Sequence, residues 1–333
     1  MKRVFRLLIL LLALCVPAHA SLTDVLEPYR TESGLLPDMP GGGFSSRVLA
    51  DEMKLRLLLD EKEAFDRLYR LMVKYFQSPM MLLYRRLDSA LKPAVYENDI
   101  AVELQVCRVL LEASRKWQIP VYRQYALKKA GRLLRYNVYR SVLINSASWK
   151  ERPSGIHSIY EPSHVLDLAS VDVQALQLLK AEMPERWESV AQRCLGILLA
   201  GSGADEPQLC YDVDRQSYIS KDDPLAVLKI MENLVDGGLV PLHSMERMTE
   251  RLRTDPKFLA EGEQGSLAVS AVAGYVLSRA GFTAEARRVF DALDETYGIG
   301  SDGASRPQNS EPPVAEKLIY LIEIAKLAPE RLK

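Results

Sequence analysis

The chain is poor in the residues that build metal sites. Among its 333 residues there are four cysteines and four histidines, and no pair of them has the spacing of zinc or iron ligands. His157, His164 and His243 lie far apart in the sequence. We therefore expect neither a metal site nor a metal-dependent reaction.

Two glycine-dependent motifs are also missing. The sequence has no Gly-x-Ser-x-Gly elbow, which would present a nucleophilic serine, and no Gly-x4-Gly-Lys loop, which would cradle phosphates. The run Gly41-Gly42-Gly43 precedes a predicted helix instead of following a strand, so it is typical of a turn and not of a dinucleotide site. We expect no cofactor.

Long runs of positive charge are absent too. The chain has 43 Lys and Arg against 44 Asp and Glu, a formal net charge of −1. Without residues 1–20 the basic residues fall to 40, so the remaining chain carries about −4. A mildly acidic protein with no polybasic segment is a poor partner for nucleic acid or for an anionic membrane.

The first 20 residues have the pattern of a secretory signal peptide. Lys2, Arg3 and Arg6 precede the apolar run Leu7–Val16, and Ala18-His19-Ala20 provides a small-residue cleavage site. The apolar run is much shorter than the roughly 20 residues that a membrane span needs. We predict a periplasmic or secreted protein without a membrane span after cleavage.

The cysteines leave two questions open. A lipoprotein anchor at Cys15 is the alternative use of the leader, although bulky Leu14 stands where a small residue is preferred. In an oxidising compartment Cys194 and Cys210 could pair, because a helix end and its following loop could bring them close. The interpretation that we favour is that Cys107 and Cys194 are small buried residues on helices.

Helical periodicity dominates the rest of the chain, and alternating strand patterns are nearly absent. Leu49, Met53 and Leu57, for example, recur four residues apart on one side of a helix. The predicted helices cover 48–59, 64–76, 100–117, 121–138, 165–182, 184–199, 225–234, 243–252, 266–279, 284–297 and 313–327.

The connections between these helices predict their arrangement. Tight turns alternate with long loops, and helices that follow tight turns begin with a capping residue or with proline, as at Pro120 and Pro184. The irregular spacing does not fit a solenoid of fixed period. We predict one all-α domain over residues 21–333, a toroid of helical hairpins like an (α/α)6-barrel, with a site where the loops gather on one rim.

Several segments match, in order and spacing, the motifs of one enzyme family. In Pro93–Ala101, for example, the family's closing Asp-Ile-Ala is intact as Asp99-Ile100-Ala101. From about Gly43 to Leu293 the chain resembles glycoside hydrolase family 8, (α/α)6-barrel enzymes that cut cellulose and related polysaccharides. The matching segments are Ser46–Met53, Phe65–Tyr69, Pro93–Ala101, Lys116-Trp117, His157–Pro162, Trp187 and Gly265–Val269.

The departures from the family fall on its catalytic positions. Arg47 stands where the family has its proton-donating glutamate, and guanidinium stays protonated at any ordinary pH. Val95 and Glu97 occupy the two aspartate positions ahead of Asp99. The family's Tyr-Asp-Ala-x-Arg becomes Tyr218–Asp222, without the aspartate or the arginine in place. The resemblance therefore implies the framework of a glycosidase without its acids.

Glu97 and Asp99 are the weak candidates for relocated catalytic carboxylates, and Asp51 or Glu52 could supply a partner one turn inside the first helix. An inverting glycosidase needs two such groups roughly 6.5–9.5 Å apart. In the interpretation that we favour, Asp99 caps the helix that begins at Ile100, and Glu97 is solvated or pairs with Arg47.

Binding a sugar requires less than cutting it, because aromatic rings and polar edges are sufficient. Tyrosine and tryptophan in loops or helix starts are candidates, with plain packing as the alternative for each, whereas Trp117 and Trp187 fall on amphipathic helices and are predicted core residues. The candidate ligand-binding residues are Arg47, Tyr84, Tyr96, Trp149 and Tyr160.

The function that the resemblance implies is association with exopolysaccharide synthesis or secretion, as a non-catalytic factor that binds or assembles a cellulose-type β-glucan. Its expected partners are the polysaccharide and the machinery that makes or exports it. Two alternatives stay open: an active endo-glycosidase with relocated carboxylates, and a periplasmic helical scaffold that binds proteins.

Overall fold

The computed structural model describes residues 26–38, 42–150, 158–160, 164–203, 208–219, 223–239, 246–247, 250, 267–297 and 313–327, without the side chains of 158–160 and 294–297. The predicted signal peptide and most of the predicted helix 243–252 lie outside these residues.

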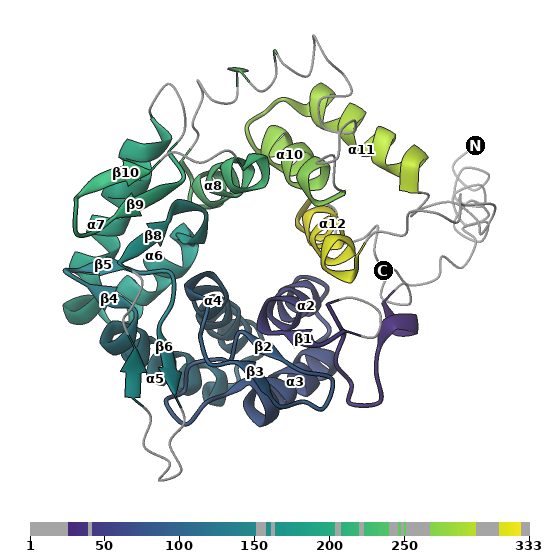
Figure 1. Ribbon diagram of the computed structural model, residues 1–333. Coiled ribbons are helices and arrows are strands. Elements are labelled where there is room, and N and C mark those ends of the chain that lie inside the picture. Colours follow the sequence, from purple (N-terminus) through teal and green to yellow (C-terminus); the bar gives the residue numbers. More distant parts are fainter. Residues whose placement is uncertain are drawn as a thin grey trace, which may run out of the picture.

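Within the described part of the chain, six helices form a closed inner ring (Figure 1). Each packs against the next in sequence, and the last packs against the first. The predicted all-α toroid is confirmed. The inner helices are α2 (Ser46–Leu58), α4 (Ile100–Trp117), α6 (Val173–Glu182), α8 (Pro224–Asp236), α10 (Leu267–Arg279) and α12 (Val314–Leu327).

Outer helices surround this ring, each packed against the inner helix that precedes it. Each outer helix returns the chain, so α2, α4, α6 and α8 start at the same end of the ring. The outer helices described are α3 (Lys62–Leu71), which continues as the π-helical turn Met72–Phe76, α5 (Pro120–Tyr136), α7 (Pro184–Ser202) and α11 (Thr283–Tyr297).

Polar caps start these four inner helices. The side chains of Ser45, Asp99, Asp172 and Asp223 each accept a backbone N–H from the first turn of α2, α4, α6 and α8 respectively. Such caps satisfy donors that the first turn leaves free. We call this end of the ring the N-terminal rim.

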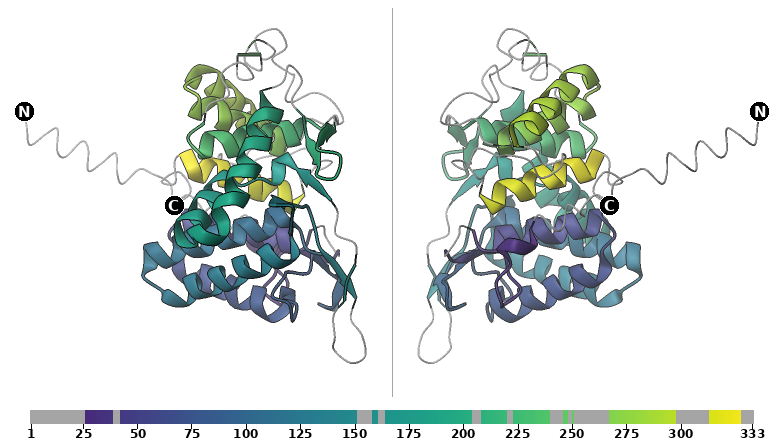
Figure 2. Two further views of the ribbon diagram at one scale, coloured as in Figure 1. Left: turned by 90° about the vertical axis from the view of Figure 1, so that its left-hand side faces the viewer. Right: turned by 90° about the vertical axis from the view of Figure 1, so that its right-hand side faces the viewer.

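Short strands gather at one end of the ring (Figure 2), although the sequence predicts almost none. They have two or three residues each, too few to produce an alternating pattern. Among the described residues they form the sheets β1 (Phe44–Ser45), β2 (Arg86–Leu87) and β3 (Pro93–Val95); β4 (Val138–Tyr139) and β5 (Val142–Leu143); β6 (Ser148–Lys150) and β7 (Ser158–Tyr160); and β8 (Val165–Asp167), β9 (Cys210–Asp212) and β10 (Ser217–Ile219).

One predicted helix is therefore too long. The predicted helix 165–182 begins only at Val173, because its first residues form β8 and a 3-10 turn (Leu168–Ser170). Two aspartates five residues apart cause this break, since Asp167 caps the 3-10 turn and Asp172 caps α6.

Cys107, Cys194 and Cys210 are buried free thiols, so Cys194 and Cys210 do not pair. The Cys194 sulfur accepts the backbone N–H of Leu143 at 3.3 Å. Burial raises the pKa of the Cys107 and Cys194 thiols to about 12. The interpretation of these residues as small apolar core positions is confirmed, as is the core position of Trp187.

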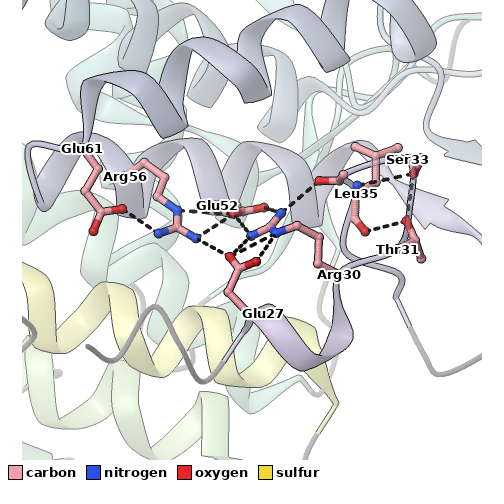
Figure 3. A network of polar contacts seen from close by, with 9 residues as sticks. Glu27, Arg30, Thr31, Ser33, Leu35, Glu52, Arg56 and Glu61 are labelled. Carbon is pink, nitrogen blue, oxygen red and sulfur yellow. Dashed lines mark hydrogen bonds and ion pairs between the residues drawn. The ribbon is translucent and has the colours of Figure 1, made fainter. Parts of the chain in front are cut away.

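The segment 26–38 is bound to α2 by a chain of ion pairs (Figure 3). Arg30 donates to Glu52 at 2.7 Å and to Glu27 at 2.9 Å. Arg56 donates to the same Glu52 oxygen at 3.1 Å and to Glu61 at 2.6 Å. Glu52 is therefore a buried structural residue.

The same segment reaches the last inner helix. Leu26 is fully buried in an apolar cluster that includes residues of α2, α10 and α12. Tyr29 accepts a hydrogen bond from Lys317 of α12 at 2.5 Å. Segment 26–38 thus stabilises the packing of α12 against α2, at which the ring closes.

Charged side chains fill the middle of the ring. Lys54 of α2 lies 3.6 Å from Glu232 of α8, although these two helices stand on opposite sides of the ring. Lys326 of α12 pairs with Glu232 and, at 3.1 Å, with Asp236. Arg108 of α4 lies 3.2 Å from Asp172 at the start of α6. These ion pairs occupy the axis, so a long ligand would have to lie across the rim and not through the ring.

Candidate functional site

The predicted site residues come from segments that meet at the starts of α2 and α4. The backbone N–H of Ser46 donates to the Arg85 carbonyl at 3.2 Å, and the N–H of Arg85 donates to the Glu97 carbonyl at 2.7 Å. Gly43 permits this close approach, because a Cβ at that position would lie 2.2 Å from the Leu87 carbonyl oxygen. Arg47, Arg85 and Glu97 therefore share one small patch of the rim.

Arg47 and Asp99 form an ion pair across this patch. The Arg47 Nη2 lies 2.8 Å from Asp99 Oδ2, while Asp99 Oδ1 accepts the N–H of Ala101 at 3.0 Å and caps α4. Arg47 is 54 % exposed and Asp99 is 15 % exposed. The capping role expected of Asp99 is present, and its second oxygen is bound to the Arg47 guanidinium.

Three carboxylates act electrostatically on the Arg47 guanidinium. Loss of water works against its charge, but Asp99, Asp51 and Asp167 outweigh that effect and raise the pKa of Arg47 above its ordinary value. A group that is always protonated and positively charged cannot give a proton to a leaving oxygen. Arg47 can instead donate several hydrogen bonds from a fixed plane.

Glu97 does not pair with Arg47. It is 28 % exposed, and its Oε1 lies 3.6 Å from Nη1 of Arg85. The next arginine, Arg86, lies 3.5 Å from Asp38. Each guanidinium of this patch thus has a carboxylate beside it, and the partner of Glu97 is Arg85 instead of Arg47.

The two acids one turn inside α2 point in different directions. Asp51 accepts a hydrogen bond from Gln105 of α4 at 2.8 Å and is half-buried. It follows Arg47 by four residues and therefore shares its helix face. Glu52 is only 2 % exposed and is bound to Arg30 and Arg56. Of these two candidates only Asp51 faces the rim site.

The predicted aromatic residues form a packed wall beside the patch. The Tyr84 ring centroid lies 5.5 Å from that of Trp149 and 5.6 Å from that of Tyr96. Trp149 is 2 % exposed and Tyr84 5 %, while Tyr96 is half-buried. Packing therefore explains Trp149 and Tyr84 in this conformation, and Tyr96 is the ring that a ligand can reach.

Tyr160 lies opposite Ser148 in the β6–β7 pair, and its side chain lies outside the described residues. The backbone N–H of Trp149 donates to the Tyr96 carbonyl at 2.9 Å, which joins this hairpin to the site. The buried indole N–H of Trp149 has no hydrogen-bond acceptor among the described residues.

Two further groups at this end of the ring were not predicted. The Asp167 carboxylate helps to stabilise the positive charge of Arg47. The backbone N–H of Asp167 donates to Asn145 Oδ1 at 2.6 Å. Asp167 was missed as a site residue because the sequence predicts a helix over residues 165–182. His164 stacks on Tyr139 with ring centroids 4.0 Å apart, and its Nδ1 lies 2.5 Å from Asp214. The hydrogen bond from His164 lowers the pKa of Asp214.

Neither a metal-ligand cluster nor a membrane-spanning helix is present among the described residues. No three His, Cys, Asp or Glu side chains among them lie close enough together to hold a metal ion. None of the helices described is at once long enough and apolar enough to cross a membrane.

Comparison of the sequence with protein-family models finds no match, and neither does comparison with curated proteins. The structure does match solved structures. An α-amylase from Clostridium perfringens is 17 % identical with a TM-score of 0.80, over 93 % of this chain and 99 % of that one. PssZ from Listeria monocytogenes is 15 % identical with a TM-score of 0.72, over 94 % and 96 %.

A third similar structure belongs to the family that the sequence motifs resemble. Endoglucanase Cel10 from Klebsiella pneumoniae, a family 8 glycosyl hydrolase, is 14 % identical with a TM-score of 0.65, over 92 % of this chain and 98 % of that one. At such low identity the likeness speaks for the fold. The described part of the chain has the (α/α)6 toroid fold of glycoside hydrolase family 8.

Proposed function

We propose that this protein binds a polysaccharide across the N-terminal rim, at Arg47 and Tyr96, and does not hydrolyse it. The ion pair between Arg47 and Asp99 carries the proposal. Similar structures that cover almost the whole chain include an endoglucanase and an α-amylase, which act on glucose polymers. A glucan of the cellulose type is the ligand that we propose.

The same ion pair argues against hydrolysis at the family's positions. Hydrolysis needs one group that gives a proton and another that activates water or attacks the sugar. Arg47 holds its proton permanently, and both oxygens of Asp99 are already bound, one by the helix cap and one by Arg47. Glu97 lies beside Arg85.

Binding, in contrast, uses what the patch offers. The guanidinium of Arg47 is half-exposed and has five N–H donors, one of which is bound to Asp99. Sugar hydroxyl groups can accept from the others, and the accessible ring of Tyr96 can lie against a sugar face. The filled axis below the rim keeps the polymer at the surface.

The cellular setting belongs to the same proposal. The leader pattern of residues 1–20 supports export, so the protein would meet its polymer in the periplasm or outside the cell. We place it with the machinery that synthesises or exports an exopolysaccharide, as a factor that holds the emerging chain.

Titration with cellohexaose, followed by calorimetry, tests binding. We expect Arg47→Gln to weaken binding by roughly tenfold, since about 1.4 kcal/mol of charge-assisted hydrogen bonding is lost. Arg67→Gln, an exposed arginine on α3, is the matched control and should leave binding unchanged. If wild type and Arg47→Gln bind equally well, or if neither binds any glucan, the proposal is wrong.

An active endo-glycosidase is the second candidate, favoured by one observation. Asp51 lies on the Arg47 face of α2, and its carboxylate accepts its hydrogen bond from an amide, that of Gln105. Reducing ends released from carboxymethyl cellulose or mixed-linkage glucan would reveal turnover. Turnover that disappears in Asp51→Asn, Glu97→Gln or Asp99→Asn would replace the binding proposal with this one.

A further inference from the structure

Beneath the rim lies a fully buried ion pair that the proposed function does not use. Glu103 of α4 and Lys129 of α5 are both 0 % exposed, and Lys129 Nζ lies 2.5 Å from Glu103 Oε2. Two charges are costly to remove from water, and apolar pairs of similar volume are often at least as stable. Stability alone therefore does not explain why both are present.

The other oxygen of Glu103 faces the segments that carry the site. Its Oε1 accepts the backbone N–H of Leu83 at 2.6 Å, and Leu83 directly precedes Tyr84. The same oxygen accepts a hydrogen bond from Nδ2 of Asn98 at 3.3 Å, and Asn98 stands between Glu97 and Asp99. One carboxylate thus fixes two of the segments that meet at the rim.

Asn98 extends this contact to a third segment. It is fully buried, and its Oδ1 accepts the N–H of Ala147 at 2.7 Å, two residues before Trp149. Asn137 holds the amide from the other side, donating to Asn98 Oδ1 at 3.1 Å and accepting from Asn98 Nδ2 at 3.0 Å. These bonds leave the Asn98 side chain one orientation.

Lys129 completes the arrangement. Besides Glu103, it donates to the carbonyl of Met81 at 2.8 Å, in a turn where Met81 has a positive φ of 65°. The turn leads directly to Leu83 and Tyr84, so Lys129 and Glu103 hold the same loop at two points.

We infer that the buried Glu103–Lys129 pair, acting through Asn98, positions the rim segments of Tyr84, Glu97, Asp99 and Trp149 for ligand binding. Glu103 and Lys129 are positioning residues, since they lie below the surface that a glycan would touch. The inference deepens the proposed function and rests on it for the ligand, but the geometry of the rim can be measured without one.

Two double variants separate positioning from stability. Glu103→Gln with Lys129→Met removes both charges but keeps an acceptor oxygen for Leu83 and Asn98. Glu103→Met with Lys129→Met removes the charges and the acceptor together. Both leave the Met81 carbonyl without its donor, so they differ only in the contact that positions the rim.

Hydrogen exchange in the full-length chain gives the first readout. We expect the amides of Leu83 and Ala147 to exchange at least tenfold faster in Glu103→Met/Lys129→Met than in Glu103→Gln/Lys129→Met. The α10–α11 hairpin should exchange equally in both, and their melting temperatures should agree within a few degrees. Equal exchange at Leu83 and Ala147 in the two variants would overturn the inference.

Cellohexaose affinity gives the second readout, with at least a tenfold loss expected only in the variant without the acceptor. If wild type binds no glucan, the proposed function fails while the exchange result still decides the positioning role.

Asn137→Ala guards against a double variant that does not fold. It should speed exchange at Ala147 and not at Leu83, and equal rates at both sites in wild type and this variant would contradict the inference.

Discussion

At the scale of single residues, the ion pair between Arg47 and Asp99 defines the patch at the starts of α2 and α4. Arg47 occupies the place expected for a proton donor, and the acids nearby, Asp51, Asp99 and Asp167, favour its charge. The ion pair with Asp99 is partly exposed, so its contribution to stability is small. Its chemical consequence is larger, because it places a permanently protonated cation on the rim.

Arg47→Glu tests this electrostatic setting. The introduced carboxyl group would stand among three acids, and like charges raise a carboxyl pKa. The folded state would then hold a proton that the unfolded state releases above about pH 4.3, so stability should fall as pH rises. We expect the free energy of unfolding to fall by about 1 kcal/mol more than in wild type between pH 5 and pH 8.

Urea denaturation at several pH values measures that difference. Arg47→Gln is the matched control, because it removes the cation without adding an acid, and its profile should stay close to that of wild type. A flat difference between Arg47→Glu and wild type would show that the three acids do not act on this position.

At the scale of elements, helix starts build the rim. Ser45, Asp99, Asp172 and Asp223 cap successive inner helices, and proline starts α5 and α7. Most of these starts are readable in the sequence because capping is a local interaction. The short strands between them were missed, because strands of two or three residues, such as those that pair Trp149 with Ile159, are too short to show an alternating pattern.

Asp99 allows the cap and the ion pair to be separated. Asparagine caps a helix about as well as aspartate, so Asp99→Asn should cost less than about 0.5 kcal/mol of unfolding free energy. Asp99→Ala loses the cap as well and should cost about 1 kcal/mol. Chemical denaturation of both variants gives the comparison, and Asp223→Ala, which loses only a cap, should resemble Asp99→Ala.

Equal stability of Asp99→Asn and Asp99→Ala would show that the cap contributes nothing measurable to α4. A large loss in Asp99→Asn would instead assign the stability to the ion pair with Arg47, contrary to the weak effect expected of an exposed pair.

At the scale of the whole molecule, charges meet inside the ring. Lys54 and Glu232 come from helices that the chain separates by more than half its length, and only ring closure brings them within 3.6 Å. Burial, with Lys326 adding to it, lowers the pKa of Lys54 to about 8. Burial, with Glu232 adding to it, raises the pKa of Glu323.

The Lys54 shift predicts a rise of stability with alkaline pH. Between about pH 8 and its unfolded value near 10.5, the unfolded state holds a proton that the folded state has released. Wild type should therefore gain on the order of 3 kcal/mol of unfolding free energy over this range relative to Lys54→Met. Denaturation curves from pH 7 to pH 10.5 measure it, with exposed Lys62→Met as control.

Parallel profiles for wild type and Lys54→Met would show that folding does not lower the pKa of Lys54. A rise of similar size lost in Lys62→Met would assign the effect to general surface charge instead of the axis of the ring.

The sequence by itself determined the local features: where helices start, which faces are apolar, and the all-α toroid class that the structure confirms. It also identified Arg47 and Asp99, because position in a motif and a helix cap are both local. Only the tertiary structure decided which carboxylate pairs with each arginine or lysine, that Trp149 is buried, and that charged side chains fill the axis of the ring. These outcomes depend on contacts between segments distant in the chain, which no local pattern encodes.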